Sequence, residues 1–181
     1  MRKLRIALDI GHARNTGAVG ESKEIQEHDL CTRLALELWR LLTLQGHDAR
    51  LFDFPTLSNA ADLNETVKAV NAWSPDILIS LHANWAASKT VKGAYVLYQS
   101  EGGRILAEAI AAPLVRVLPG WHSLTEKRTG LAILGQTKPV AVLVEAGFIT
   151  SKHDSDMLRY NREPIAEAIA EGVAAYARIK N

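Results

Sequence analysis

Short apolar runs alternate with longer amphipathic segments along most of the chain. The apolar runs have the length of β-strands and cover residues 4–10, 47–54, 76–81, 93–99, 131–134 and 140–144. Between them, apolar residues recur at helical spacing over residues 27–45, 60–73, 104–117 and 164–179. Strands that alternate with helices are typical of layered α/β folds, so we predict this class.

The size of the chain indicates one domain. It has 181 residues, of which 48% are hydrophobic, and a domain usually has roughly 100–150 residues. No repeat or Pro/Ser-rich linker divides it, so we expect residues 1–181 to form a single domain. The only cysteine, Cys31, excludes an internal disulfide, and we expect its side chain to be buried as a small apolar group.

The charge pattern excludes several classes of partner. The chain has 21 Lys+Arg and 20 Asp+Glu with a net charge of +1, and the basic residues are scattered among acidic ones, so we expect no nucleic-acid binding. No segment has the roughly 20 apolar residues of a membrane span. The first apolar run is interrupted at Arg5 and ends at Asp9. We therefore expect synthesis in the cytoplasm without a signal peptide.

Three of the apolar runs lead into side chains that bind metals or move protons. His12, His82 and Glu145 each follow one of these runs. If the strands are parallel, their carboxyl ends meet at one edge of the sheet, and the three groups face one crevice. A fourth candidate, Glu27, opens the first helix after the long polar loop over residues 11–26. A carboxylate at this place also interacts favourably with the helix N-terminus.

Two imidazoles and a carboxylate form a common ligand set for catalytic zinc. A second carboxylate beside the metal can take a proton from water and pass it to a leaving amine, which is the chemistry of amide hydrolysis. From the residues alone, a purely structural role has nearly equal weight. Glu21 and Glu24 compete with Glu27, and Asp9 fits a partner that orients a histidine better than it fits a ligand. We expect the remaining histidines to lie at the surface, and these are His28, His47, His122 and His153.

Four different short motifs follow one another along the chain. They are Asp9-Ile10-Gly11-His12, then Glu27 before a Leu-rich helix, then Ser80-Leu81-His82-Ala83-Asn84, and finally the segment from Pro139 to Ile149. Together they resemble the motifs of the zinc-dependent N-acetylmuramoyl-L-alanine amidases of the amidase-3 family. This resemblance covers nearly the whole chain. It implies an α/β domain with a mostly parallel six-stranded sheet and helices on both faces.

The resemblance also implies a site and a reaction. His12, Glu27 and His82 correspond to the residues that hold Zn²⁺ in the family, and Glu145 corresponds to the catalytic carboxylate. The implied reaction is hydrolysis of the amide between N-acetylmuramic acid and L-alanine in peptidoglycan or a muropeptide. Zinc-bound water is then the nucleophile, and Glu145 is the general base and later the acid. The alternatives are a catalytically idle wall-binding module and a zinc peptidase or deacetylase with the same ligands.

Two further residues are candidates for substrate binding. Asn84 follows His82, where its amide can bond a substrate carbonyl or merely cap a turn. In the family, a second glycine usually follows the turn after the first strand, whereas this chain has Ala13 and Arg14 there. Arg14 either contacts a substrate carboxylate or is solvated. Trp85 forms a wall of the groove or is an exposed loop aromatic.

The biological setting follows from the missing export signal. An amidase made in the cytoplasm needs another route to the wall, so we expect a monomeric phage or prophage lysis enzyme, an endolysin, that acts after release. A fragment of an exported precursor and a recycling enzyme for soluble wall fragments are the alternatives.

Overall fold

The computed structural model of the protein describes residues 2–14, 16–20, 26–120 and 124–179. Within them the chain forms a six-stranded sheet with the strand order β2-β1-β3-β6-β4-β5. Its strands are β1 (Arg5–Ile10), β2 (Asp48–Phe52), β3 (Ile77–Asn84), β4 (Tyr95–Tyr98), β5 (Thr125–Lys127) and β6 (Val140–Phe148). All neighbouring strands are parallel except β4 and β6. The predicted α/β class with a mostly parallel six-stranded sheet is confirmed.

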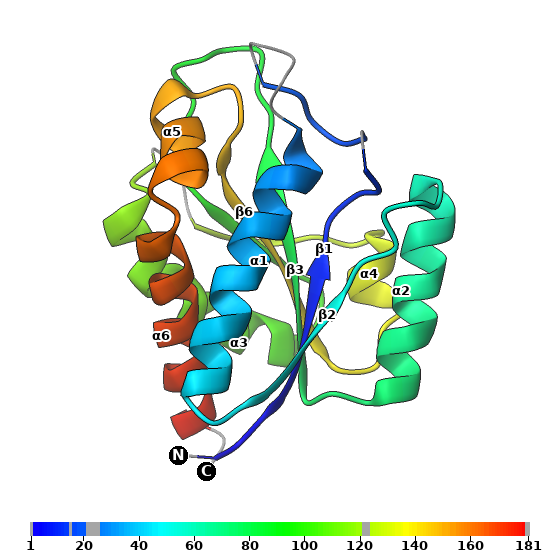
Figure 1. Ribbon diagram of the computed structural model, residues 1–181. Helices are drawn as coiled ribbons and strands as arrows, with labels where there is room; N and C mark the ends of the chain where they lie inside the picture. Colours follow the sequence, from blue (N-terminus) through cyan, green and yellow to red (C-terminus); the bar gives the residue numbers. More distant parts are fainter. Residues whose placement is uncertain (1, 15, 21–25, 121–123, 180–181) are drawn as a thin grey trace.

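Helices cover both faces of this sheet, but unequally (Figure 1). The helices are α1 (Glu27–Leu44), α2 (Asn59–Trp73), α3 (Glu101–Val117), α4 (Ala132–Gly135), α5 (Lys152–Tyr160) and α6 (Glu163–Ile179). In the view of Figure 1, α1, α3, α5 and α6 lie to the left of the sheet, and α2 and the short α4 lie to its right. One face is therefore thickly covered, and the other is covered only in part.

The alternation of side chains along the strands produces two separate cores. Ile6, Leu8 and Ile10 point toward the thickly covered face, where they join a large apolar cluster with residues of α1, α3, α5 and α6. Ala7 points the other way and joins a smaller cluster under α2 and α4. By the same alternation, Asp9 shares the thinly covered face with Ala7. Polar groups near the strand ends therefore lie on the face that leaves room for a ligand.

The segment over residues 131–134 was predicted as a strand, and this prediction is wrong. It leads into α4, whose first turn is closed by hydrogen bonds from the N–H groups of Leu134 and Gly135 to the carbonyl of Leu131. A run of four apolar residues has the same composition in a short strand and in one helical turn, so its pattern could not distinguish them.

Two elements had no counterpart among the predicted ones. β5 has only three residues and no apolar alternation. α5 is mostly polar, and it begins where the hydroxyl of its N-cap, Ser151, accepts a hydrogen bond from the N–H of Asp154. None of the helices among the described residues is long and apolar enough to cross a membrane.

Candidate metal and catalytic site

His12 lies two residues beyond the end of β1, in a left-handed backbone conformation. Its φ angle is 65°, which is unusual for a residue other than glycine. This conformation turns the imidazole toward the first helix, and Nε2 lies 3.3 Å from Oε2 of Glu27. A strained backbone at a polar side chain is typical of residues that a functional site holds in place.

Glu27 is the first residue of α1, and its buried carboxylate links both histidines. Oε1 lies 3.0 Å from Nδ1 of His82 and accepts a hydrogen bond from the N–H of Ala83, and Oε2 accepts one from the N–H of Ala18. Burial by itself raises the pKa of this carboxyl group. The contacts with His12 and His82 outweigh burial and hold the pKa well below its ordinary value. Glu27 is therefore a fixed anion at the helix N-terminus.

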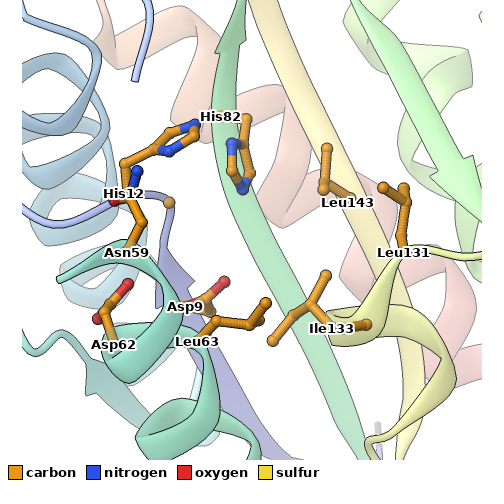
Figure 2. Close-up of a pocket in the computed structure, with 11 residues that line it drawn as sticks. Asp9, His12, Asn59, Asp62, Leu63, His82, Leu131, Ile133 and Leu143 are labelled. Carbon is orange, nitrogen blue, oxygen red and sulfur yellow. The ribbon is translucent and has the colours of Figure 1, made fainter. Parts of the chain in front are cut away.

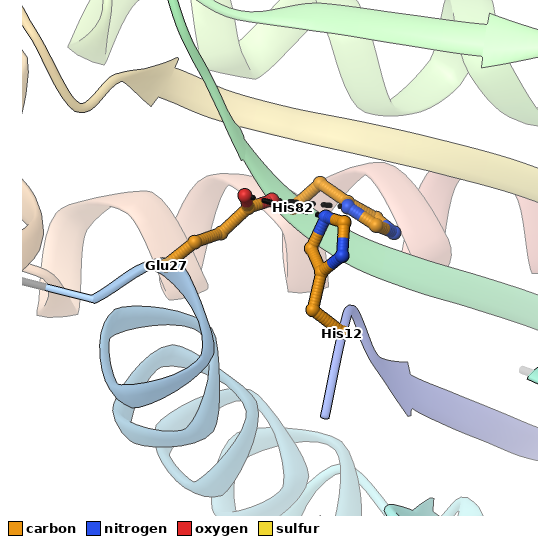
Figure 3. A group of neighbouring side chains, drawn as sticks. All are labelled: His12, Glu27 and His82. Carbon is orange, nitrogen blue, oxygen red and sulfur yellow. Dashed lines mark hydrogen bonds and ion pairs between the residues drawn. The ribbon is translucent and has the colours of Figure 1, made fainter. Parts of the chain in front are cut away.

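The third member, His82, lies on β3 and meets the other two at one point (Figure 3). The rings of His12 and His82 are 5.0 Å apart and nearly perpendicular. One ligand atom from each of His12, Glu27 and His82 lies within 4.8 Å of the others. Burial lowers the pKa of His82, but the hydrogen bond with Glu27 and further carboxylates raise it above its ordinary value.

Two glycines leave the space that this cluster occupies. A Cβ atom on Gly11 would lie 2.6 Å from Nδ1 of His82. A Cβ atom on Gly17 would lie 2.7 Å from Oε2 of Glu27, and the φ angle of Gly17 is +84°. The three donors therefore depend on residues without side chains at both positions.

Glu145 lies on β6 directly opposite His82 of β3 in the parallel register. Paired residues on neighbouring strands point to the same face, so the carboxylate stands beside the cluster. Its Oε2 atom is buried and has no hydrogen-bond partner among the described residues. Burial raises the pKa of Glu145 above its ordinary value, although His82 acts in the opposite direction. A desolvated carboxyl group with a raised pKa is suited to accept a proton.

The site residues differ in detail from the expected strand ends. β3 and β6 pair beyond the predicted limits, so His82 and Glu145 lie inside the strands rather than after them. Asp9 is 5% exposed and accepts a hydrogen bond from the hydroxyl of Ser80. We expected Asp9 to orient a histidine, but its hydrogen-bond partner in the structure is Ser80. Burial raises the pKa of Asp9 to about 6.

Two of the histidines expected at the surface are buried. Nε2 of His28 lies 3.0 Å from a carboxylate oxygen of Asp53, and Nδ1 of His47 accepts a hydrogen bond from the N–H of Leu4. Both contacts join residues far apart in the sequence, so no local pattern indicates them. His153 is half exposed and Cys31 is buried, as expected. His122, Glu21 and Glu24 lie outside the described residues.

The substrate-binding candidates lie in different surroundings. The side chain of Arg14 is exposed, and its N–H donates to the carbonyl of Pro55. Asn84 is partly buried, its Oδ1 atom accepts a hydrogen bond from the N–H of Trp85, and it lines a pocket with Glu145. Trp85 is 56% exposed.

Two pockets flank the cluster. The first, which we call the Asp9 pocket, has a volume of about 250 Å³ and lies between α2, α4 and the strands (Figure 2). Its lining is largely apolar and includes Asp9, Asp62, His82, Leu131 and Ile133. The second, which we call the Glu145 pocket, has a volume of about 440 Å³ and is lined by residues that include Asn84, Tyr95, Glu126, Arg128, Leu131 and Glu145. Four of these residues were not predicted from the sequence. Tyr95, Glu126 and Arg128 reach the site through the pairing of β4 and β5 with β6, and Asp62 reaches it through the packing of α2.

Comparison with known proteins identifies the family. Residues 6–175 match the family Amidase_3, which is described as N-acetylmuramoyl-L-alanine amidase. The chain belongs to this family. It is 29% identical to the probable cell wall amidase LytH of Staphylococcus saprophyticus over 94% of its own length. It spans 57% of the length of that relative.

Solved structures of similar proteins have the same fold. The amidase AmiC2 of Nostoc punctiforme matches with a TM-score of 0.85 and 25% sequence identity, with 98% of each chain covered. The catalytic domain of the CD27L endolysin targeting Clostridia difficile matches with a TM-score of 0.82 and 27% identity, with 95% of this chain and 97% of that chain covered. The Amidase_3 fold thus extends over nearly the whole chain.

Proposed function

We propose that the chain is an amide hydrolase that cleaves the bond between N-acetylmuramic acid and L-alanine of peptidoglycan, and that residues 1–181 form its catalytic domain. The observation that carries the proposal is the convergence of His12, Glu27 and His82 beside Glu145, whose buried Oε2 atom has no hydrogen-bond partner in the part of the chain that the structure describes. The family and the relatives named as cell wall amidases support the same reaction.

The donor set fits a zinc ion. Two imidazole nitrogens and one carboxylate oxygen are the ligands of many catalytic zinc sites, which keep a further position open. His12, Glu27 and His82 would hold the ion, because one ligand atom from each of them lies within 4.8 Å of the others. Nε2 of His12 and Nδ1 of His82 are the atoms that face the carboxylate of Glu27. When bound, zinc supplies a Lewis acid that polarises an amide carbonyl and makes water more acidic.

Glu145 performs the proton transfers in this proposal. It accepts a proton from the attacking water, whose oxygen forms a bond to the lactyl carbonyl carbon. The bond between this carbon and the alanine nitrogen then breaks, and Glu145 passes the proton to the departing amine. Its burial favours the protonated form that must persist between the two transfers.

Asn84 orients the substrate in this proposal. Its Oδ1 atom already accepts a hydrogen bond from the N–H of Trp85. The amide nitrogen is therefore the atom that can donate to a substrate carbonyl, and Asn84 lines the same pocket as Glu145. Arg14, by contrast, is exposed and does not line either pocket. In this proposal Arg14 contacts only the outer part of a long substrate.

A pair of variants tests the assignment of roles. Glu145→Gln should retain about one zinc per chain and lose roughly 10²–10⁴-fold in the rate of wall hydrolysis, because it removes the proton acceptor. His82→Ala should lose both the zinc and the activity. Glu108→Gln on the exposed surface of α3 is the matched control and should behave like the parent. Hydrolysis by Glu145→Gln at the parent rate would overturn the mechanism.

We further propose a lysis role, as in an endolysin. The likeness to the CD27L endolysin domain supports this setting. A lysis enzyme should release peptide from intact, insoluble walls at least as fast as from soluble muropeptides. Activity confined to soluble muropeptides would instead indicate a recycling enzyme.

A further inference from the structure

The Glu145 pocket extends the site along the sheet toward β4 and β5. In the antiparallel register of β4 and β6, Tyr95 is paired with Glu145. Leu97, two residues further along β4, is paired with Glu126 of β5. Side chains two residues apart share a face, so Tyr95, Leu97, Glu126 and Glu145 all point to the thinly covered face.

Arg128 follows β5 and brings a positive charge to this pocket. Its N–H donates to the carbonyl of Tyr98, which fixes the backbone against β4. Its Nε atom lies 2.8 Å from Oε1 of Glu126, and both side chains are about half exposed. An ion pair with this exposure is weak, so it orients the guanidinium without excluding a stronger partner. Among the described residues that line the pocket, Arg128 is the one cation.

Arg128 and the proposed proton acceptor Glu145 line the same pocket. A substrate group bound in this pocket beside Glu145 therefore lies within reach of the guanidinium. An arginine can bind a carboxylate through two parallel N–H groups, which adds geometric specificity to the charge attraction.

The Asp9 pocket differs from the Glu145 pocket in that no arginine or lysine is among its described lining residues. Its described lining contains two buried carboxylates, Asp9 and Asp62, together with apolar side chains. Leu131 lines both pockets and thus lies where they adjoin. A substrate whose scissile amide lies beside His82 and Glu145 can place one half in each pocket. The half with a negative charge belongs with Arg128.

We propose that the Glu145 pocket binds the peptide half of the substrate, and that Arg128 pairs with a free carboxylate on the stem residue next to the released alanine. This inference rests on the proposed function. In that reaction the muramic acid side is neutral before cleavage, because its carboxyl group forms the amide, whereas the peptide side carries carboxylates. The chain therefore prefers stem peptides in which this carboxylate is free over those in which it is amidated.

Two matched substrates test the pairing. They are the muramoyl tripeptide N-acetylmuramoyl-L-alanyl-γ-D-glutamyl-L-lysine and the same compound with the α-carboxylate of its glutamyl residue converted to an amide. The parent enzyme should have a kcat/KM at least about tenfold higher for the free carboxylate, which is the effect of one good charged hydrogen-bonded contact. Arg128→Gln should reduce this ratio to near one, and Arg128→Lys should restore part of it.

Two further variants establish that the effect is specific. Glu126→Gln removes the competing anion and should increase the ratio above that of the parent. Arg104→Gln removes another arginine that pairs with glutamate at the surface, from α3 on the other face of the sheet, and should leave the ratio unchanged. A ratio near one in the parent enzyme, or an unchanged ratio in Arg128→Gln, would overturn the inference.

A binding measurement separates this inference from the proposed function. The two product tripeptides are titrated by calorimetry into Glu145→Gln and into the double variant Glu145→Gln/Arg128→Gln. The tripeptide with the free carboxylate should bind to Glu145→Gln more tightly than the amidated tripeptide does. The double variant should bind the two tripeptides with equal affinity. If this holds while no muramoyl peptide is cleaved by the parent, the proposed function fails and the pocket assignment stands. If the parent cleaves muramoyl peptides but Glu145→Gln binds the two tripeptides with equal affinity, the pocket assignment fails and the proposed function stands.

Discussion

His82 and Glu145 lie directly opposite each other on the neighbouring parallel strands β3 and β6, on the same face of the sheet. His82 contacts Glu27 through Nδ1, and Glu145 has a buried carboxylate oxygen without a partner among the described residues. One strand thus presents a candidate metal donor and the next presents a candidate base. The sheet register itself sets their separation, so the pair depends on the central strands and not on a loop.

Replacing Gly11 should disrupt the metal donors. In Gly11→Ala the new Cβ would lie 2.6 Å from Nδ1 of His82, so the imidazole must move. We expect zinc affinity to fall by roughly 10–100-fold, as is typical when the support of a ligand is lost. Competition with a chromophoric chelator measures this change.

Gly46→Ala provides the matched control for this substitution. Gly46 has a φ angle of +87°, and its Cβ would meet nothing within 4 Å. Alanine there should reduce the free energy of unfolding by about 1 kcal/mol through backbone strain, with no change in zinc affinity. Equal zinc affinity in Gly11→Ala and the parent would contradict the account of the site.

Zinc affinity should rise with pH. The carboxylates around His82 raise its pKa, so a proton occupies this imidazole at higher pH than usual and competes with the metal. Glu27 is ionised throughout, because its pKa is lowered. We expect affinity to increase about tenfold per pH unit around and above the ordinary pKa of histidine, until His82 is neutral.

Zinc titrations between pH 6 and pH 8 measure this dependence. His153→Gln, at a half-exposed position on α5, should leave the slope unchanged. An affinity that does not vary over this range would show that no proton leaves when the metal binds.

Asp9→Asn should stabilise the metal-free protein at neutral pH. Burial raises the pKa of Asp9 to about 6 from 3.8, so ionisation at higher pH opposes folding. Below the pKa that Asp9 has in the unfolded chain, its carboxyl group is protonated in both the folded and the unfolded state. The destabilisation grows as the pH rises from this pKa to the pKa of Asp9 in the folded protein. Above it, the cost is about 3 kcal/mol. The stability gain of Asp9→Asn should therefore be small near pH 4 and reach its maximum above pH 6.

Urea unfolding of chelator-treated protein at several pH values measures this gain. Asp156→Asn, which removes a partly exposed carboxylate that pairs with Lys152, should give a gain close to zero at every pH. A gain for Asp9→Asn that is the same at pH 4 and pH 8 would mean that burial does not raise its pKa.

Removal of the metal should abolish activity before it abolishes the fold. The larger apolar cluster lies under α1, α3, α5 and α6, and none of the three candidate metal donors belongs to it. Chelated protein should keep its circular dichroism spectrum and a cooperative thermal transition, with a lower midpoint because bound metal stabilises the native state. Added zinc should restore activity. Complete unfolding on chelation would contradict a self-sufficient core.

The elements with strong periodicity could be predicted from the sequence, and so could the grouping of His12 and His82. Continuous apolar runs identified the central strands, and the Leu-rich pattern identified α1. The sequence also placed Glu27 at the start of that helix. These features are local, so each leaves its own pattern.

The features that could not be predicted depend on tertiary contacts. The apolar pattern predicts a strand at residues 131–134, where the chain forms the helical turn of α4, because four apolar residues fit either element. The hydrogen bond from Leu4 to His47 joins residues 43 positions apart, so its burial has no local signal. Arg128 reaches the Glu145 pocket only through the pairing of β5 with β4. The surroundings of His47 and Arg128 therefore depend on contacts between distant segments, which the periodicity of the sequence does not record.

Hydrolysis of purified peptidoglycan in ¹⁸O-labelled water tests the central claim most directly. The account predicts that mass spectrometry finds one labelled oxygen in the lactyl carboxylate of muramic acid, and that each released peptide begins with an unlabelled, free L-alanine amine. Label in a peptide carboxylate would identify a peptidase, and label in released acetate would identify a deacetylase. Either of these results, or the absence of label from all products, would contradict the proposed reaction.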